Sequence, residues 1–460
     1  MRIHDRGLIS AAALGALVTL VTRDASAAGT ALDVQSARGT GMASATTAWI
    51  DDSSAIFYNP AGIAQGKGLS AEVGVSLISP SFAFTSATTG SKRWGKFTVS
   101  PPFQGYGTIG LTDNLSVGLG LFTPYGLTVV WPGGWLGRSV STESSLQTFY
   151  ANPTVAYKLG PLRIGAGLQV VRATLELQRD IQFGDQFGHA DLAGGAWGVG
   201  ANVGVQLQAI EQYLSLGAHY RSAVGLDFDS ANVHFSNVPL IFQSTLHDQP
   251  VMGSVTMPDS LAMGVSSRPI KDLNIAVDVV WYDWKKFHEV ALHYPLDASA
   301  SLDTRELKNW HNTVNVHVGA EGNLGRHWML RGGVLYDPSP SPDETLLPDV
   351  PDATRVNFAI GGSYLTESGL HFDAGYQFLF LITKTSTAPQ LPGDYTGFAN
   401  ILGLSIGYTT PRERMPSNVT PPEPPPPPPP ESVPPPLPVA PEPAAPPPPP
   451  VLEPPPTTEP

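Results

Sequence analysis

About fourteen times between Leu69 and Tyr408, a stretch that alternates apolar with polar or glycine residues is followed by a break. Residues 198–208 (GVGANVGVQLQ) are a clear example, with Val199 and Val203 on one face and Asn202 on the other. A period of two is typical of a strand whose faces meet different surroundings. Repeated so often without a helical period between, it favours a closed barrel with lipid outside and water or ligand inside. We therefore predict an all-β transmembrane antiparallel β-barrel of about 14 strands.

The composition agrees with a barrel, which hides its apolar residues by alternation. Mean hydropathy is only −0.03. After the first residues no apolar run approaches the roughly 18 residues of a spanning helix, which excludes transmembrane helices. Charged residues make up 14% and glycines number 47, which suits small residues on an inner wall. The net charge of −13 argues against nucleic acid as a partner. The chain has no cysteine, so disulfides and thiolate metal sites are excluded.

Four segments follow from the composition. In residues 1–27, Arg2 and Arg6 precede an apolar stretch and a small-residue cleavage site, which indicates an export signal; a short buried helix is the alternative. Residues 28–68 show little alternation, and residues 69–409 hold the strands. Residues 410–460 form a proline-rich tail that favours extended polyproline II and disorder. The tail is either a passive spacer or a docking strip for a periplasmic or cell-wall partner.

The breaks between strands alternate in length. Short breaks rich in turn-forming residues lie at 112–114, 159–161, 209–212, 268–272, 323–327 and 366–368, and the other breaks are longer. An even strand count with alternating short and long connections is the plan of bacterial outer-membrane barrels, with short turns and both termini in the periplasm. Residues 287–295 could form a separate strand, which would change the count.

Several pieces of the chain, in their order and spacing, resemble the FadL/TodX family of outer-membrane transporters of long-chain fatty acids and other hydrophobic compounds. The pieces are NPAG at 59–62, MPDS at 257–260, WMLRGGVLYD at 328–337, and LPD at 347–349 followed by an arginine at 355. The resemblance covers residues from about 31 to 408. It implies passive uptake of hydrophobic molecules, with an N-terminal hatch inside the barrel and a side exit at a kinked third strand.

The hatch turn is expected at Asn59, Pro60, Ala61 and Gly62. Proline fixes φ and keeps the preceding residue out of the helical region, while glycine tolerates conformations that other residues avoid. The asparagine side chain can satisfy backbone groups that such a turn leaves unpaired. The alternative is a surface turn that leads into the first strand.

An outer apolar patch and a strand kink are the next expectations. The loop 123–145 carries a large apolar load, which usually marks binding, although packing among loops is the alternative. The patch residues are Leu127, Val129, Trp131, Trp135 and Leu136. Pro124 and Gly126 end the alternation of the third strand, and because proline cannot donate to the ladder we expect a kink there; a simple strand end is the alternative.

A carboxylate ligand would require an arginine inside the barrel. Arg221 and Arg331 are inward by alternation. Arg172 would face lipid unless a bulge near Val170 and Val171 changes the parity, and we predict such a bulge. All three are candidate carboxylate-binding residues. The alternative is pairing across the lumen with acids such as Glu321, Asp278 and Asp373.

Two other functions are alternatives. A general diffusion porin shares the barrel, although the hatch-like segment and the apolar loop count against it. An outer-membrane lipase would need a nucleophile beside a histidine, and His219, His317 and His371 have no nucleophile-elbow motif with them. We expect no catalytic residue, metal or cofactor. The expected partners are hydrophobic small molecules, fatty acids among them, and the lipid and lipopolysaccharide of the outer membrane.

Overall fold

The computed structural model describes residues 29–297, 299, 301–411, 445–448 and 450–451. The expected export signal and most of the expected tail therefore lie outside the described residues. The chain divides into two units, residues 1–412 and 413–460. The described part of the second unit has neither helix nor strand.

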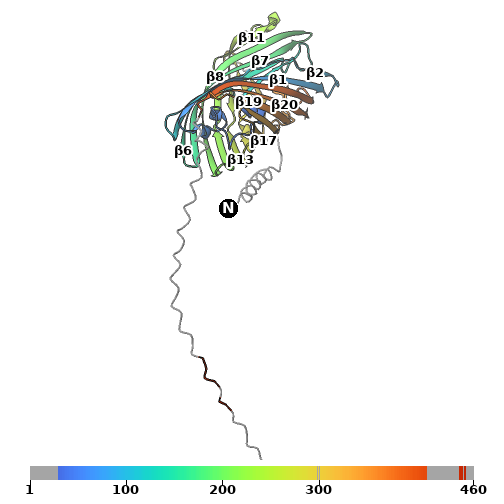
Figure 1. The fold of residues 1–460 in the computed structure, drawn as a ribbon. Coiled ribbons are helices and arrows are strands. Elements are labelled where there is room, and N and C mark those ends of the chain that lie inside the picture. Colours follow the sequence, from blue (N-terminus) through green and yellow to red (C-terminus); the bar gives the residue numbers. More distant parts are fainter. Residues whose placement is uncertain (1–28, 298, 300, 412–444, 449, 452–460) are drawn as a thin grey trace, which may run out of the picture. The chain divides into compact units, whose positions relative to one another are not determined.

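Within the first unit, 14 strands close into one antiparallel barrel, as predicted (Figure 1). Each wall strand pairs with the next one along the chain, and the last pairs with the first from Ser70–Thr409 to Ser86–Gly393. The wall strands are β1 (Gly68–Ser86), β3 (Phe103–Gly110), β4 (Leu115–Phe122), β6 (Glu143–Leu159), β7 (Leu162–Phe183), β8 (Gln186–Ile210), β9 (Leu214–Arg221), β13 (Ser260–Ile270), β14 (Leu273–Tyr282), β17 (Thr313–Leu324), β18 (Trp328–Asp337), β19 (Arg355–Leu365), β20 (Leu370–Ser386) and β21 (Gly393–Thr409).

The predicted short breaks are the turns at one end of the barrel, which we call the short-turn end. They connect β3 to β4, β6 to β7, β8 to β9, β13 to β14, β17 to β18 and β19 to β20. The opposite end, the long-loop end, carries the longer connections. Residues 287–295 contain a strand outside the wall, so the wall count stays at 14.

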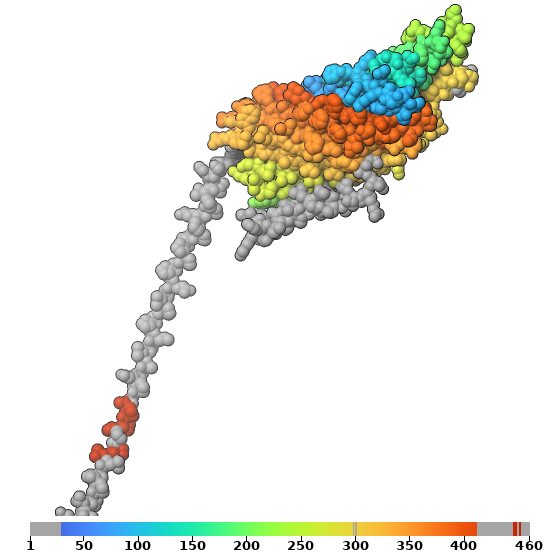
Figure 2. Space-filling view, turned by 90° about the vertical axis from the view of Figure 1, so that its right-hand side faces the viewer, coloured from blue at the N-terminus to red at the C-terminus, as the bar shows by residue number. Residues whose placement is uncertain are grey.

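The long-loop end has its own strands and short helices. β11 pairs with the far part of β8, β12 pairs with β11 and β15, and β15 pairs with β16. Figure 2 shows the green β7–β8 hairpin and the yellow-green segment after it projecting beyond the neighbouring strands. The elements at this end are β2 (Lys92–Trp94), β5 (Gly126–Val130), β10 (Val224–Asp227), β11 (Ala231–Ser236), η2 (Leu240–Phe242), β12 (Gln249–Met257), η3 (Trp284–Lys286), β15 (Glu289–His293) and β16 (Thr304–Leu307).

The two faces of the wall strands differ as the alternation predicted. On β8, Val199 is 66% exposed on the outer face, whereas Asn202 is 2% exposed on the inner face. Among the described residues, none of the helices has both the length and the apolar character needed to cross a membrane.

An N-terminal segment, residues 29–67, lies against part of the inner face and contains α2 (Ala37–Gly41), α3 (Ala55–Tyr58) and η1 (Pro60–Ile63). Glycines on the wall make room for it. A Cβ on Gly204 of β8 would lie 2.1 Å from Asn59 Oδ1, and one on Gly375 of β20 would lie 2.4 Å from the Ala37 carbonyl oxygen. Since real Cβ atoms do not approach so closely, these glycines allow the segment to lie directly on the wall.

We expect Gly204→Leu to displace the segment, because overpacking of this kind costs about 1–3 kcal/mol. The chain has no cysteine, so Ser53→Cys, at a position that is 1% exposed, gives a single-thiol reporter. A water-soluble maleimide should label this thiol several-fold faster with Gly204→Leu than without it. Val203→Leu, at an outward position on the same strand, is the matched control. Equal labelling rates in the two variants would contradict the contact.

Candidate ligand-binding cavities

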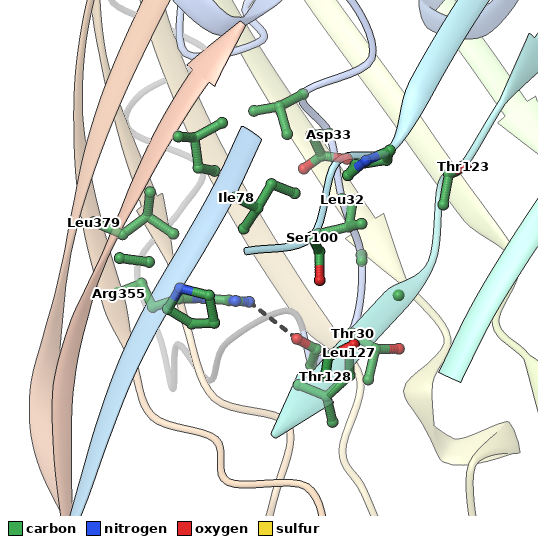
Figure 3. Close-up of a pocket in the computed structure, with 18 of the residues that line it drawn as sticks. Thr30, Leu32, Asp33, Ile78, Ser100, Thr123, Leu127, Thr128, Arg355 and Leu379 are labelled. Atoms are coloured by element: carbon green, nitrogen blue, oxygen red, sulfur yellow. Dashed lines mark hydrogen bonds between the residues drawn. The ribbon is translucent and has the colours of Figure 1, made fainter. Parts of the chain in front are cut away.

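An apolar cavity of about 300 Å³, which we call the lateral cavity, lies between the barrel interior and the outer face (Figure 3). On the inner side it is lined by Ile78 of β1, Leu127 of β5 and Leu379 of β20. On the outer side it reaches Phe103 and Phe149, which are 54% and 38% exposed and whose ring centroids are 6.2 Å apart. The lining therefore includes residues from both faces of the wall.

The wall is interrupted beside this cavity, between β4 and β5. Phe122 pairs with Tyr150 of β6, and Gly126 pairs with Gln147. Between these two pairs lie three residues on the β4–β5 side (123–125) and two on β6 (148–149), so the β4–β5 side has one extra residue. Such an extra residue bends a strand and disrupts its ladder. The structure places Pro124 and Gly126 at this interruption.

The N-terminal segment supplies part of the missing backbone pairing at the interruption. The Leu32 amide donates to the Pro124 carbonyl at 2.8 Å, and the Gly126 amide donates to the Thr30 carbonyl at 3.0 Å. Ala31 and Tyr125 form an isolated antiparallel bridge between these two bonds. Since an unpaired buried backbone group is costly, the segment stabilises the wall at this interruption.

A second apolar cavity of about 190 Å³, the loop cavity, lies at the long-loop end. Leu175 and Leu177 of β7, Trp284, and the β15 residues Val290 and Leu292 line it. It shares three lining residues with the lateral cavity, so the two are neighbours. These residues are Thr30, Leu127 and Leu146.

A buried ion cluster lies beside the loop cavity. Lys308 is 1% exposed, its Nζ lies 2.7 Å from Asp349 Oδ2, and it also pairs with Glu306. Burial alone would lower the pKa of Lys308, but the two carboxylates outweigh this effect and leave the pKa above the ordinary lysine value. The cluster connects the β16 hairpin to the loop that contains Asp349.

The prediction of an exposed apolar patch is wrong, because most of its residues are buried in a cluster at the long-loop end. Val129, Trp131 and Trp135 are 3%, 1% and 2% exposed, and the two indoles stack with centroids 4.3 Å apart. They pack with Phe84 of β1, with Tyr395 of β21 and with the loop residues Leu346 and Leu391. Of the five patch residues only Leu136 is exposed, at 53%, and Leu127 lines both cavities. The alternative, packing among loops, describes this region.

Arg172 faces the outer surface, so the predicted bulge is wrong. The register of β7 with β8 runs without a shift from residue 162 to residue 183. The Arg172 guanidinium carbon lies 5.4 Å from the ring centre of the outward-facing Trp197. Leu175 and Leu177 keep the inward parity of the buried Val171. The change in pattern that suggested a bulge instead marks where the inner wall becomes apolar.

Arg221 and Arg331 face inward as expected, but their partners belong to the protein. Arg221 Nη2 donates to the Phe57 carbonyl at 2.8 Å, and its guanidinium lies 4.3 Å from the centre of that ring. Arg331 pairs with Glu321 at 3.3 Å and with Asp373 at 3.4 Å. The alternative partners Glu321 and Asp373 therefore hold Arg331, but along the inner wall on nearby strands and not across the lumen. Arg221 holds the N-terminal segment.

The NPAG turn at 59–62 is buried against β8 and β9. Asn59 is extended (φ −164°, ψ 104°), as expected before proline, and Pro60 begins η1. The Asn59 amide group donates to the carbonyls of Thr47 at 2.8 Å and Val205 at 3.0 Å. Gly62 is required for space and not for an unusual φ, because a Cβ there would lie 2.6 Å from a backbone oxygen.

A polar cavity of about 470 Å³ lies at the short-turn end. Arg38 of the N-terminal segment bridges Asp51 at 2.7 Å, Asp52 at 2.8 Å and the wall residue Glu321 at 2.6 Å. Arg331 extends this network along the wall. Within the described part of the chain, no group of three His, Asp or Glu side chains could hold a metal ion.

The charged residues of the lateral cavity were not among the ligand-binding residues predicted from the sequence, although Asp337 and Arg355 belong to the pieces that carry the family resemblance. Arg355 begins β19; its Nη2 lies 2.7 Å from Asp337 Oδ2 and donates to the Gly29 carbonyl at 3.3 Å (Figure 3). Alternation in the sequence could have placed Arg355 inward, because Asn357, two positions on, is polar. In the structure Asn357 is 3% exposed and faces inward. Asp33 also lines the cavity but belongs to a segment without periodicity, so the sequence carries no comparable signal for it.

Comparisons with known proteins agree with this architecture. The chain is 24% identical over 451 residues to the long-chain fatty acid transport protein of Escherichia coli O6:H1, covering 88% of this chain and 100% of that protein. It is 23% identical over 345 residues to outer membrane protein P1 of Haemophilus influenzae, covering 65% and 73%. Among solved structures, a Pseudomonas aeruginosa FadL homologue superposes with a TM-score of 0.71 at 17% identity, covering 83% of this chain and 99% of that one.

The Pseudomonas putida toluene transporter TodX superposes with a TM-score of 0.66 at 16% identity, covering 85% of this chain and 100% of that one. At such identities the superpositions show the fold. The sequence model described as outer membrane protein transport protein (OMPP1/FadL/TodX) matches residues 18–409. The chain therefore belongs to the OMPP1/FadL/TodX family of outer membrane transport proteins.

Proposed function

We propose that this protein is a passive outer-membrane channel for hydrophobic small molecules, long-chain fatty acids or other apolar compounds. Its substrates enter at the long-loop end and leave sideways through the interruption between β4 and β5. The proposal is carried by one observation: the loop cavity and the lateral cavity share Leu127 and Leu146, and the lateral cavity reaches the outward-facing Phe103.

The energetics favour such a route over a water-filled pore. Each buried methylene contributes about 0.8 kcal/mol, so a long alkyl chain is stabilised by apolar walls and not by water. No nucleotide-binding motif is found in the sequence, and the direction of transport then follows the concentration gradient. In this proposal the short-turn end and both termini lie in the periplasm, and the long loops meet the lipopolysaccharide outside.

We also propose that residues 28–68 act as a hatch that closes the lumen to polar solutes. Three contacts support the role: Asn59 to the carbonyl of Val205, Arg221 to the carbonyl of Phe57, and Arg38 to Glu321. All three join the segment to the wall on its inner side. A general diffusion porin would need a continuous aqueous path past these contacts.

Filling the lateral cavity should slow transport. Gly126 lines the cavity, and a Cβ there would lie 3.2 Å from Leu32 Cδ1, so Gly126→Trp places an indole in the path. We expect uptake of radiolabelled hexadecanol into proteoliposomes to fall by about tenfold, equivalent to about 1.4 kcal/mol. Gly133→Trp is the matched control, because a Cβ at the exposed Gly133 meets nothing within 4 Å. Uptake by Gly126→Trp at the control rate would contradict the route.

Deleting residues 29–64 should leave a folded barrel that leaks small polar solutes and retains hydrophobic ligands poorly. Liposome swelling with sugars measures the leak. A milder variant, Asn59→Ala, removes one donor from the carbonyls of Thr47 and Val205, of which Thr47 keeps the Gln206 amide at 3.3 Å. Each lost hydrogen bond of this kind costs about 0.5–1.5 kcal/mol. Asn59→Ala should leak less than the deletion and more than the parent. If the deletion assembles normally and changes neither property, the hatch role is refuted, and sugar permeation by the intact chain would favour the porin.

A further inference from the structure

We infer that the lateral cavity selects neutral hydrophobic molecules over those that carry a carboxylate. The inference rests on the proposed function and narrows its substrate class. Among the described residues that line the cavity, four side chains carry a formal charge, and the three carboxylates against one guanidinium give a net charge of −2. The four are Asp33, Asp337, Asp352 and Arg355.

The single guanidinium is already occupied. Arg355 pairs with Asp337 at 2.7 Å and donates to the carbonyl of Gly29, and the charges of Asp352 and Asp33 attract it further. A ligand carboxylate would have to displace a carboxylate that is 7% exposed and held by the same protein. Removing one partner of a buried pair leaves an uncompensated charge, which opposes the exchange.

Asp33 is the second element of the argument. Its carboxylate enters from the N-terminal segment, whereas Arg355 enters from β19 (Figure 3). Asp33 Oδ1 accepts a hydrogen bond from the Tyr282 hydroxyl at 2.8 Å, and Asp33 makes no ion pair among the described residues. An anionic ligand beside it would be repelled, since two like charges in surroundings of low dielectric interact strongly.

Neutral ligands meet no such obstacle. Most of the lining is aliphatic, aromatic or proline, which suits a hydrocarbon. Ser100, Thr123 and Thr128 also line the cavity, and their hydroxyls can exchange hydrogen bonds with an alcohol (Figure 3). A hydroxyl ligand can therefore be satisfied at little cost, whereas a desolvated carboxylate without a free cation is expensive.

The loop cavity does not reverse this balance. Its charged lining residues are three acids and two arginines, a net charge of −1; these are Glu143, Glu306, Asp349, Arg179 and Arg305. Adding Lys308, which is engaged by two of those acids, brings the sum to zero. Neither cavity therefore has a positive net charge that would attract a carboxylate along the route.

The test compares hexadecanol with hexadecanoate at pH 8 on the full chain in one detergent, with the partition of each probe into empty micelles subtracted. We expect the full chain to bind hexadecanol at least about tenfold more tightly than hexadecanoate. Asp33→Asn keeps the size of the side chain and an acceptor for Tyr282, and it should reduce this ratio by about threefold or more. Asp113→Asn, at a side chain that is 82% exposed at the short-turn end, should leave the ratio unchanged.

The outcomes separate the two claims. If the chain binds both probes, and binds hexadecanoate as tightly as hexadecanol, the proposed selectivity is overturned while the proposed channel function stands. An unchanged ratio in Asp33→Asn would overturn the role of Asp33. Tighter binding of hexadecyltrimethylammonium than of hexadecanol would show selection of cations and overturn the preference for neutral ligands. Binding of none of the probes would overturn the proposed function and the inference with it.

Discussion

Lipid offers no hydrogen bonds, so a structure that spans it with strands must pair its wall backbone internally, and the rest of this fold depends on that constraint. The seam between β1 and β21 meets it by closing the sheet on itself. The wall departs from regular pairing between Phe122 and Gly126. There the backbone of residues 30–32 in the N-terminal segment forms hydrogen bonds with the Pro124 carbonyl and the Gly126 amide from inside the barrel. The interruption beside the lateral cavity and the N-terminal segment are therefore joined by backbone hydrogen bonds.

The same constraint explains where glycine is used. An inward side chain would keep the N-terminal segment away from the wall, and the donors of Asn59 and Arg221 could not then reach their backbone acceptors. Gly204 and Gly375 remove that obstacle, and their outward neighbours stay apolar for lipid. Alternation between glycine and valine along β8 therefore encodes two separate contacts, one with lipid and one with the segment inside.

The sequence was sufficient to predict the barrel. A period of two shows directly which side chains face outward and which face inward, and turn-forming residues mark the short breaks. It was insufficient where surroundings changed along a strand. Beyond Val171 the inner wall of β7 becomes apolar, and Leu175 and Leu177 then look like a shift of parity, which is why Arg172 was placed on the wrong face. The sequence around Trp131 and Trp135 does not show which distant segments cover them, so it predicts an exposed patch where the structure has a buried cluster. The partners of Arg331 and the position of Asp33 depend on contacts between distant segments.

The distribution of charge along the lumen supports the lateral exit that we propose. The loop and lateral cavities are lined mainly by apolar side chains, whereas the cavity at the short-turn end is lined by the network of Arg38, Glu321 and Arg331. An alkyl chain that moved from the first region to the second would lose about 0.8 kcal/mol for every methylene transferred to polar surroundings. It would also have to disturb ion pairs whose partners are buried, and that adds a further cost. A sideways step past Phe103 into the hydrocarbon of the membrane avoids both costs, because the methylene groups pass from one apolar environment to another.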